Sequence, residues 1–523
     1  MITTDYIIIT IYLLGMILLS VFVGRGQKSK EDYYVGGRKL PWWAIGISTM
    51  ATQTSAVSFI SIPAFVAIKQ NGGLTWLQYE LGVPIAIIFV ICLFIPYFRK
   101  LKLISIYEYL ELRYNRQVRL LVSFVFLISR GFATGIGVYA IAIVLSTCMG
   151  LNLRLTILMI GVITIVYDTI GGIKAVVYSD VIQTIVLFGG IFLCIYYCIE
   201  EVGSLQEVLS NFPKQRMNPL DFSSGFNKSS DLPLWAFLCG GIFLYVSYYG
   251  TDQSQVQREL SAGSVQETKK SLVFNGIARF PLTLMYVMFG IALYSFLVEV
   301  PELKNQITEQ EPDYLVPYFI LHLPAGIRGL LFASLLAAAM SSLDSALNSL
   351  SAITMQDFVL KNTKKKLNEL KVSRWVTICW GIVITTCAFF AGDIAETVIE
   401  SINKVGSASY GPILAAFTMG IISKRNYRYF IYYGIVAGVL FNVVLWVYFP
   451  QVFWMWWNLF GFLVTVAITE LLYLFNKKET ITIGLTHLPD RGLIKANQKH
   501  VVVLSMYFLF ILGILVLLSL LTS

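Results

Sequence analysis

Hydroxyl groups and one carboxylate interrupt an otherwise apolar segment, residues 333–352. On a helix that advances 100° per residue, one small and polar face contains Ala338, Ser341, Ser345, Asn348 and Ser349. Asp344 lies at the rim of that face. A carboxylate inside a membrane costs about 2.5–3.5 kcal/mol or more, so Asp344 is expected to face protein or a wet cavity. Oxygen ligands suit hard cations, and the face therefore predicts a sodium site, the alternative being a Ser/Ala helix-packing seam.

Further ionisable residues fall within apolar segments. They are Glu80, Arg130, Asp168, Asp180 and Arg279. Singly, such groups often form structural ion pairs or reach towards an interface; together they favour a functional site. The sequence leaves open whether Glu80 and Arg279 bind each other or a solute.

The elements that carry these groups are transmembrane helices. Of 523 residues, 57% are hydrophobic and 13% charged, which is typical of a polytopic membrane protein. Apolar runs of about 20 residues match a hydrocarbon core about 30 Å thick. We expect about fourteen helices, over residues 5–24, 42–68, 75–97, 118–148, 155–173, 177–199, 234–253, 272–297, 325–359, 375–395, 398–422, 429–449, 453–475 and 500–521. The first lacks a signal peptide's basic region and cleavage site and is read as retained.

Composition also argues against catalysis. With three histidines, the chain has little material for a histidine metal site or a catalytic triad, and no nucleophile–base pair is evident. The seven cysteines lie in apolar segments and are expected to be buried thiols. We therefore expect a protein that is not an enzyme.

The net charge of +9 is concentrated in every second loop. The basic loops are 25–39, 99–119, 258–270, 361–374, 424–428 and 477–499. By the positive-inside rule they are cytoplasmic, so an even number of helices places both termini outside the plasma (inner) membrane. The charge is explained by topology, and no nucleic-acid partner is predicted.

Two segments look like interrupted helices. Residues 48–58 are rich in hydroxyl and β-branched side chains, and Gly240-Gly241 precedes the polar run 245–253. Interrupted helices at corresponding places in two halves indicate a transporter's central site, here within two five-helix inverted repeats. The alternative is a bundle with ordinary Gly/Pro kinks. The expected divisions are 1–41 (first helix and cytoplasmic loop), 42–199 (first repeat), 200–233 (extracellular loop), 234–424 (second repeat) and 425–523 (peripheral helices).

Several motifs resemble the sodium/solute symporters, a family that includes sodium-glucose and bacterial sialic acid transporters. The similar stretches are 33–38 (YYVGGR), 104–110, 171–180 (GGIKAVVYSD), 255–258 (QVQR) and 341–349. The resemblance implies an all-α, LeuT-like five-plus-five fold with a broken first core helix. It also implies that a small-molecule solute crosses the bilayer with Na⁺ by alternating access.

The resemblance also implies ligands for sodium. The principal site would use the carbonyls of Ala51, Thr54 and Ala338 and the hydroxyls of Ser341 and Ser342. A second site would use Asp180, Ser341 and Ser345, with Asp344. Asp344 departs from the family pattern, because several relatives have a hydroxyl or small residue there. It would strengthen that second site or carry a proton instead.

The solute site is implied in the same way. Its residues would be Gln53, Ser55, Ser58, Glu80, Tyr248, Arg279 and Asn403. The carboxylate-binding arginine of the sialic acid branch matches Ala133, and Arg130 lies one turn earlier, available to an acidic solute or to a structural ion pair. Converging amides and charges suit a hydroxyl-rich solute.

We therefore expect a sodium-coupled importer of a sugar, polyol or sugar acid. The alternatives are uptake of sialic acid or another small carboxylate, and, in a different class, a membrane solute sensor or channel. The sequence contains no signal for an oligomeric state.

Overall fold

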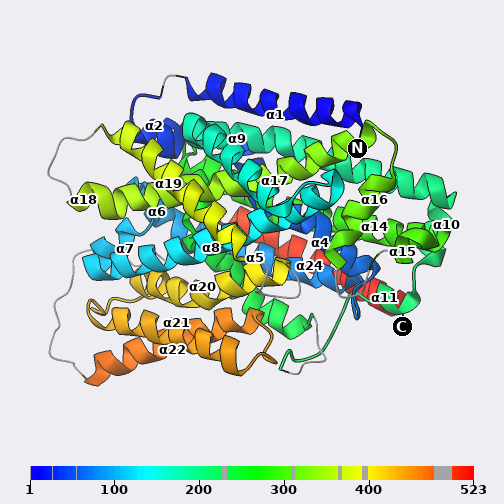
Figure 1. Ribbon diagram of the computed structural model, residues 1–523. Coiled ribbons are helices and arrows are strands. Elements are labelled where there is room, and N and C mark those ends of the chain that lie inside the picture. The colour runs from blue at the N-terminus through cyan, green and yellow to red at the C-terminus, as the bar shows by residue number, and fades with distance from the viewer. Residues whose placement is uncertain are drawn as a thin grey trace.

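Long helices run side by side through the molecule in the computed structural model (Figure 1). The structure describes residues 2–25, 27–54, 56–226, 232–305, 307, 312–362, 368–391, 398–475 and 497–522. In these residues no strand forms, and one isolated bridge joins Leu40 to Ala262. The architecture is all-helical, as expected.

The helices follow one another along the chain. The first half contains α1 (Thr3–Gly24), α2 (Lys30–Val35), α3 (Trp42–Gln53), α4 (Ala56–Ala67), η2 (Leu74–Leu81), α5 (Gly82–Phe89), η3 (Val90–Phe94), α6 (Ile95–Leu101), α7 (Glu108–Arg113), α8 (Arg116–Met149), α9 (Leu153–Val202), α10 (Leu205–Asn211) and α11 (Lys214–Met217). The second half contains η4 (Ala236–Gly240), α12 (Gly241–Thr251), α13 (Gln253–Leu260), α14 (Val265–Glu299), α15 (Pro301–Asn305), α16 (Leu315–His322), α17 (Ile327–Ile353), η6 (Thr354–Val359), α18 (Leu360–Asn362), α19 (Glu369–Phe389), α20 (Val398–Ile422), α21 (Phe430–Tyr448), α22 (Met455–Phe475) and α24 (Gln498–Thr522). Two short 3₁₀ turns are η1 (Gly36–Arg38) and η5 (Pro312–Tyr314).

Within the described residues, 11 helices are long and apolar enough to cross a membrane. The bent pair of α3 and α4, at 56°, raises this to 12. The expected number of about fourteen is therefore not confirmed. The difference has two sources: the helix ending at Thr251 is short, and α9 joins two expected spans in one 50-residue element.

Gly172 breaks α9 between those two expected spans. A straight helix of this length would extend about 75 Å, more than twice the hydrocarbon thickness. Gly172 adopts φ 58° and ψ −168°, outside helical geometry. A Cβ at this position would lie 2.8 Å from the carbonyl oxygen of Tyr33. Glycine is required here both by the positive φ and by the close approach of α2.

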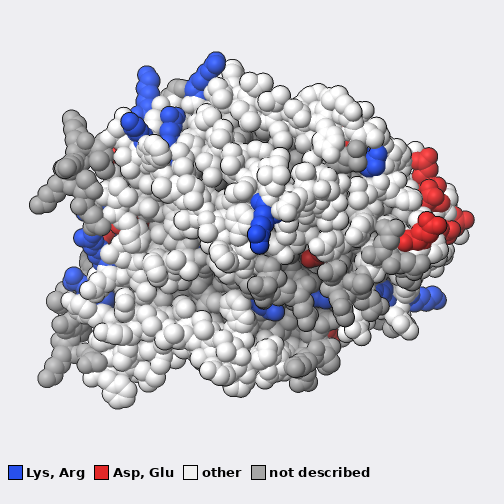
Figure 2. All heavy atoms as spheres, viewed as in Figure 1, with Lys and Arg blue, Asp and Glu red and all other residues white. Residues whose placement is uncertain are grey.

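Both chain ends lie at the same end of the bundle, the right-hand end of Figure 1. In the view of Figure 2, acidic side chains gather at that end, whereas most of the charged side chains visible at the opposite end are Lys and Arg. The polarity of the surface therefore agrees with basic loops on one side of a membrane.

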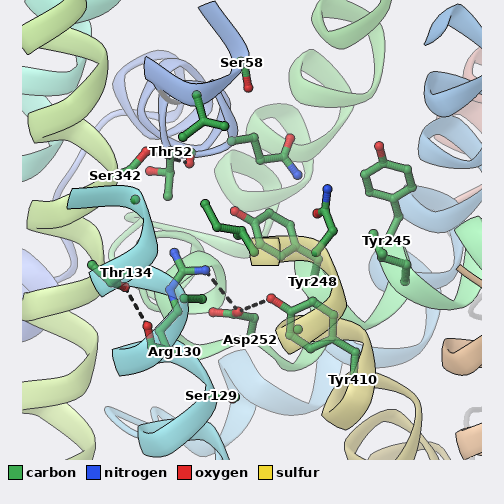
Figure 3. A pocket seen from close by; sticks show the side chains of 18 of the residues that line it. Thr52, Ser58, Ser129, Arg130, Thr134, Tyr245, Tyr248, Asp252, Ser342 and Tyr410 are labelled. Carbon is green, nitrogen blue, oxygen red and sulfur yellow. Dashed lines mark hydrogen bonds and ion pairs between the residues drawn. The ribbon is translucent and has the colours of Figure 1, made fainter. Parts of the chain in front are cut away.

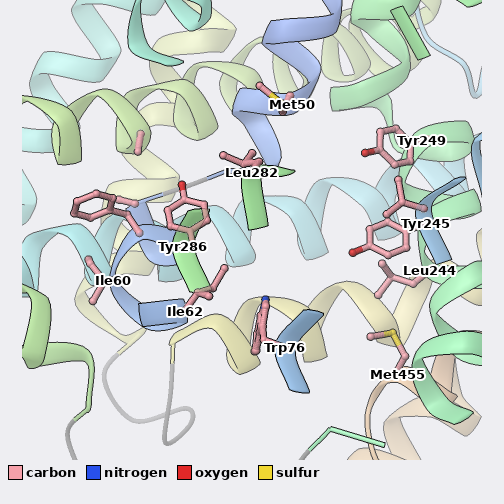
Figure 4. Packing of buried hydrophobic residues seen from close by; sticks show 14 of the residues in the cluster. Met50, Ile60, Ile62, Trp76, Leu244, Tyr245, Tyr249, Leu282, Tyr286 and Met455 are labelled. Atoms are coloured by element: carbon pink, nitrogen blue, oxygen red, sulfur yellow. The ribbon is translucent and has the colours of Figure 1, made fainter. Parts of the chain in front are cut away.

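The most deeply buried span is α17, which packs against α9, α8, α1, α3 and α19. Aromatic and aliphatic side chains fill the space around the bent pair, as Figure 4 shows for Ile60 and Ile62 of α4 beside Tyr286 of α14. The rings of Phe59 and Tyr286 meet edge to face with centroids 6.5 Å apart. In contrast, α21 and α22 lie together at the margin of the bundle (Figure 1). The polar helix is thus shielded from lipid, as an intramembrane carboxylate requires.

Candidate functional site

The end of α3 lies against the middle of α17. The hydroxyl of Ser342 donates to the carbonyl of Thr52 at 3.3 Å, and the hydroxyl oxygens of Thr52 and Ser345 are 3.0 Å apart. The chain leaves helical geometry at Thr54, with φ −98° and ψ 73°. Such an interruption leaves the last carbonyls of a helix without their full set of intrahelical partners. Backbone and hydroxyl oxygens therefore gather where α3 ends.

The residues predicted for the principal sodium site lie at this junction. Ala51, Thr54, Ala338 and Ser341 are buried, and Ser342 is half-buried. The hydroxyl of Ser341 faces Asp180 but makes no hydrogen bond among the described residues. A buried hydroxyl without a hydrogen-bond partner lowers the stability of the folded state by roughly 1–3 kcal/mol, and a cation bound to its oxygen would offset that cost.

The region predicted for a second sodium contains the side chain of Arg258. Its guanidinium donates to the hydroxyls of Ser48 (2.6 Å) and Ser345, and lies 3.4 Å from Asp180. Ser48 also donates to Asp180. A fixed protein cation thus lies between the two residues proposed to bind that ion.

Asp344 points away from a cavity that lies between α4, α8, α12, α17 and α20. The cavity is lined by its neighbours Ser342 and Leu343. Asp344 is fully buried, near Asp168 and Tyr167 of α9, and neither its oxygens nor those of Asp168 accept a hydrogen bond from the described residues. The two carboxylates therefore form a buried pair on the α9 side of α17.

A cavity of about 180 Å³ lies between α4, α8, α12, α17 and α20 (Figure 3). Of the predicted solute residues, those lining it are Gln53, Ser58, Arg130, Tyr248, Arg279 and Asn403. Glu80 lies behind Arg279, and Ser55 lies outside the described residues. The structure therefore brings together side chains from both halves of the chain.

Glu80 and Arg279 bind each other. The two nitrogens Nη2 and Nε of Arg279 lie 2.7 and 3.2 Å from the two Glu80 carboxylate oxygens, and Thr283 donates to the same carboxylate at 2.7 Å. Glu80 is 1% exposed. A two-point pair of this kind fixes both side chains and satisfies the buried charge.

Arg130 enters the cavity beside Asp252, one turn before Ala133, which also lines it. Its Nη1 lies 3.8 Å from Asp252 Oδ2, and the hydroxyl of Tyr410 donates to that same oxygen at 3.1 Å (Figure 3). On the other side, Gln255 donates to the Tyr248 hydroxyl at 2.7 Å. This polar cluster forms one wall of the cavity.

Sequence reasoning missed three of these participants, namely Asp252, Tyr410 and Arg258. Asp252 was visible as part of the polar run that ends an interrupted helix, and Arg258 as the last residue of the QVQR motif. Tyr410 gave no local signal, because only the fold brings α20 to Asp252.

The sequence pattern of the sodium:solute symporter family matches residues 33–440. The chain belongs to this family. The symporter is 30% identical to the sodium/sialic acid symporter NanT of Aliivibrio fischeri over 453 residues, which cover 85% of this chain and 88% of that protein. It is also 30% identical to the human sodium/iodide cotransporter over 458 residues, covering 85% of this chain and 69% of that protein.

A solved structure has the same fold as this symporter. It is the substrate-bound outward-open state of a Na⁺-coupled sialic acid symporter, with a TM-score of 0.79 and 27% identity, covering 91% of this chain and 98% of that one. Family membership makes sodium the coupling ion and a small molecule the cargo, and the multi-pass helical architecture places the chain in a membrane.

Proposed function

We propose that this symporter imports a small solute carrying a carboxylate, either sialic acid or a smaller organic acid, together with sodium. The observation that carries the proposal is Arg130, a guanidinium that lines the cavity. The relatives named above transport sialic acid and iodide, and both of these cargoes are anions. A guanidinium is well suited to a carboxylate, because its N–H donors match both oxygens.

The remaining cavity side chains suit the rest of such a solute. The amides of Gln53 and Asn403 and the hydroxyl of Tyr248 offer donors and acceptors to hydroxyl or amide groups. These groups also support the second candidate, a neutral sugar or polyol, which would use them without Arg130. Arg279 contributes less to either cargo, since Glu80 occupies its nitrogens.

Sodium would bind to the carbonyls of Ala51, Thr54 and Ala338 and the hydroxyls of Ser341 and Ser342. Neutral oxygens hold one positive charge weakly enough for release on the inner side. At about −100 mV one sodium contributes roughly 2.3 kcal/mol, and a tenfold gradient adds about 1.4 kcal/mol. For a neutral solute, one ion would thus support accumulation on the order of 500-fold. A monovalent carboxylate carries one negative charge inwards with the ion, so the voltage contribution cancels and about tenfold accumulation remains.

The proposed topology follows the charge of the loops. Basic connections would face the cytoplasm, both termini would lie outside, and residues 42–199 and 234–424 would form the two inverted repeats that rock about the site. The buried Asp180, Asp344 and Ser345 would bind a second cation only after Arg258 moves from its position between Asp180 and Ser345.

Uptake into proteoliposomes with a sodium gradient as the sole driving force tests the function. We expect sodium-dependent accumulation of sialic acid or lactate, and none of glucose. Arg130→Gln should abolish acid uptake, whereas Arg154→Gln, which removes an exposed arginine at the start of α9, should leave it unchanged. Glucose uptake that survives Arg130→Gln would establish the neutral candidate, and sodium-independent uptake would contradict the coupling.

A further inference from the structure

We propose that Asp252 is a specificity-determining residue that holds Arg130 in the cavity and is displaced from it by the carboxylate of the solute. This inference rests on the proposed function, because it concerns the same arginine. In this proposal, the Asp252 carboxylate is a competitor within the cavity. A solute binds only if its own carboxylate replaces Asp252 at the Arg130 guanidinium. The geometry of both partners supports this exchange.

Asp252 does not need Arg130 for its own stability. It is 2% exposed and lies at the break between α12 and α13, where its Oδ1 accepts hydrogen bonds from the backbone N–H of Ser254 (2.8 Å) and from the Ser254 hydroxyl (2.6 Å). Its Oδ2 accepts from Tyr410 at 3.1 Å. Both oxygens therefore remain bonded when Arg130 turns away, and the helix cap persists.

Arg130 is poorly satisfied by comparison. None of the hydrogen bonds in the described structure uses its nitrogens, and its buried Nε has no partner. Its closest carboxylate oxygen is Asp252 Oδ2 at 3.8 Å, well beyond the usual N–H···O distance. The Tyr248 hydroxyl also faces the guanidinium. A partly buried guanidinium in this state gains from any ligand that offers two oxygens.

The second arginine of the cavity is the internal comparison. Arg279 makes contacts of 2.7 and 3.2 Å with Glu80, which also accepts from Thr283. Both partners of that pair already have their hydrogen bonds, so a solute carboxylate that displaced Glu80 would form no more hydrogen bonds than it broke. The two arginines therefore differ in function. Arg279 is fixed by its ion pair with Glu80, whereas Arg130 is only loosely paired with Asp252 and is available to bind a solute carboxylate.

The decisive variant is Asp252→Asn. Asparagine is as good an N-cap as aspartate, so the start of α13 and the contact with Tyr410 are kept while the competing charge is removed. Glu259→Gln is the matched control, because it removes another buried carboxylate from α13 whose partners, Thr49 and Ser271, lie outside the cavity lining. Arg130→Gln and the double variant Arg130→Gln/Asp252→Asn complete the set.

Binding would be measured in sodium by the thermal shift of the full-length protein in detergent, since a ligand stabilises the folded state by mass action. The probes are sialic acid, lactate, the neutral analogue lactamide, and formate as the smallest carboxylate. Asp252→Asn should bind the acids at least about tenfold more tightly and leave lactamide unchanged. Glu259→Gln should match the wild type.

The double variant separates this inference from the proposed function. In the Arg130→Gln background, Asp252→Asn should give no gain for any acid. Equal affinities of wild type and Asp252→Asn for formate and lactate, or a gain that persists without Arg130, would overturn the role of Asp252. A wild type that takes up no carboxylate would defeat the proposed function alone, because formate still reports whether Asp252 masks Arg130.

Discussion

Arg279 and Glu80 form a closed ion pair next to the solute cavity, with nitrogen–oxygen distances of 2.7 and 3.2 Å. Removing one partner leaves the other as an uncompensated buried charge, which typically costs about 3–5 kcal/mol. Arg279→Gln should therefore lower the free energy of unfolding by about that amount and the melting temperature by several degrees. Thermal unfolding in detergent measures the effect.

Two further variants give this prediction its control. The double replacement Glu80→Leu/Arg279→Met should cost less than either single change, because no charge is left behind. Arg425→Gln breaks an exposed pair with Glu470 (2.5 Å) and should have little effect, since water screens that pair. Equal melting temperatures for Arg279→Gln and Arg425→Gln would show that the buried pair is not structural.

Gly172 should not tolerate a side chain. Its φ of 58° is unfavourable for alanine, and the added Cβ would lie 2.8 Å from the Tyr33 carbonyl oxygen. Gly172→Ala should therefore destabilise the protein by about 1–3 kcal/mol from backbone conformation alone. Gly189→Ala, in the same helix with no atom within 4 Å of its Cβ, should be neutral or stabilising by up to about 1 kcal/mol. Equal melting temperatures for these two variants would argue against the kink as a constraint.

Glu111 makes stability depend on pH at the basic end of the bundle. Burial raises its pKa, but the hydrogen bonds and the positive charges of Lys361 and Arg119 together outweigh burial and leave the pKa below the ordinary 4.5. A lowered pKa stabilises the folded state above that ordinary value, and the contribution is lost as the pH falls through the folded-state pKa. The melting temperature of the wild type should thus fall more steeply than that of Glu111→Gln below about pH 4.5.

The control for this pH dependence is Glu369→Gln, which removes a partly exposed carboxylate 3.4 Å from Lys30. Its melting curve should parallel that of the wild type across the acid range. If Glu111→Gln also runs parallel to the wild type, the contacts of Lys361 and Arg119 with Glu111 add nothing to stability.

Polar residues within apolar runs were the most informative part of the sequence. The predictions of a buried polar helix at 333–352 and of a bent helix near residue 54 are confirmed by α17 and by the α3–α4 pair. These features are local, because periodicity and interrupted hydropathy lie within one segment. The predicted spans 155–173 and 177–199 correspond to the two parts of α9 on either side of the kink at Gly172.

Pairings between residues that are distant in the chain could not be predicted from the sequence. Glu80 could meet Arg279 or a solute, and Arg258 carried no mark of its position between Asp180 and Ser345. Such choices depend on which helices pack together, and residues 180, 258 and 345 come from three different elements. The sequence therefore predicted several of the polar groups that line the cavity, missed Asp252, Tyr410 and Arg258, and did not predict which groups pair with each other.

Ser342 tests the sodium site most directly. Its hydroxyl lies 3.3 Å from the Thr52 carbonyl, at the end of α3, where the last carbonyls of that helix lack intrahelical partners. Loss of one ligand of this kind costs about 1–1.5 kcal/mol, so Ser342→Ala should raise the sodium concentration for half-maximal uptake by up to about tenfold. Ser349→Ala is the control, because that hydroxyl donates within its own helix to Ala346 at 2.8 Å. Sodium-dependent uptake in proteoliposomes should shift for the first variant and stay unchanged for the second, and an unshifted Ser342→Ala would remove this serine from the ion site.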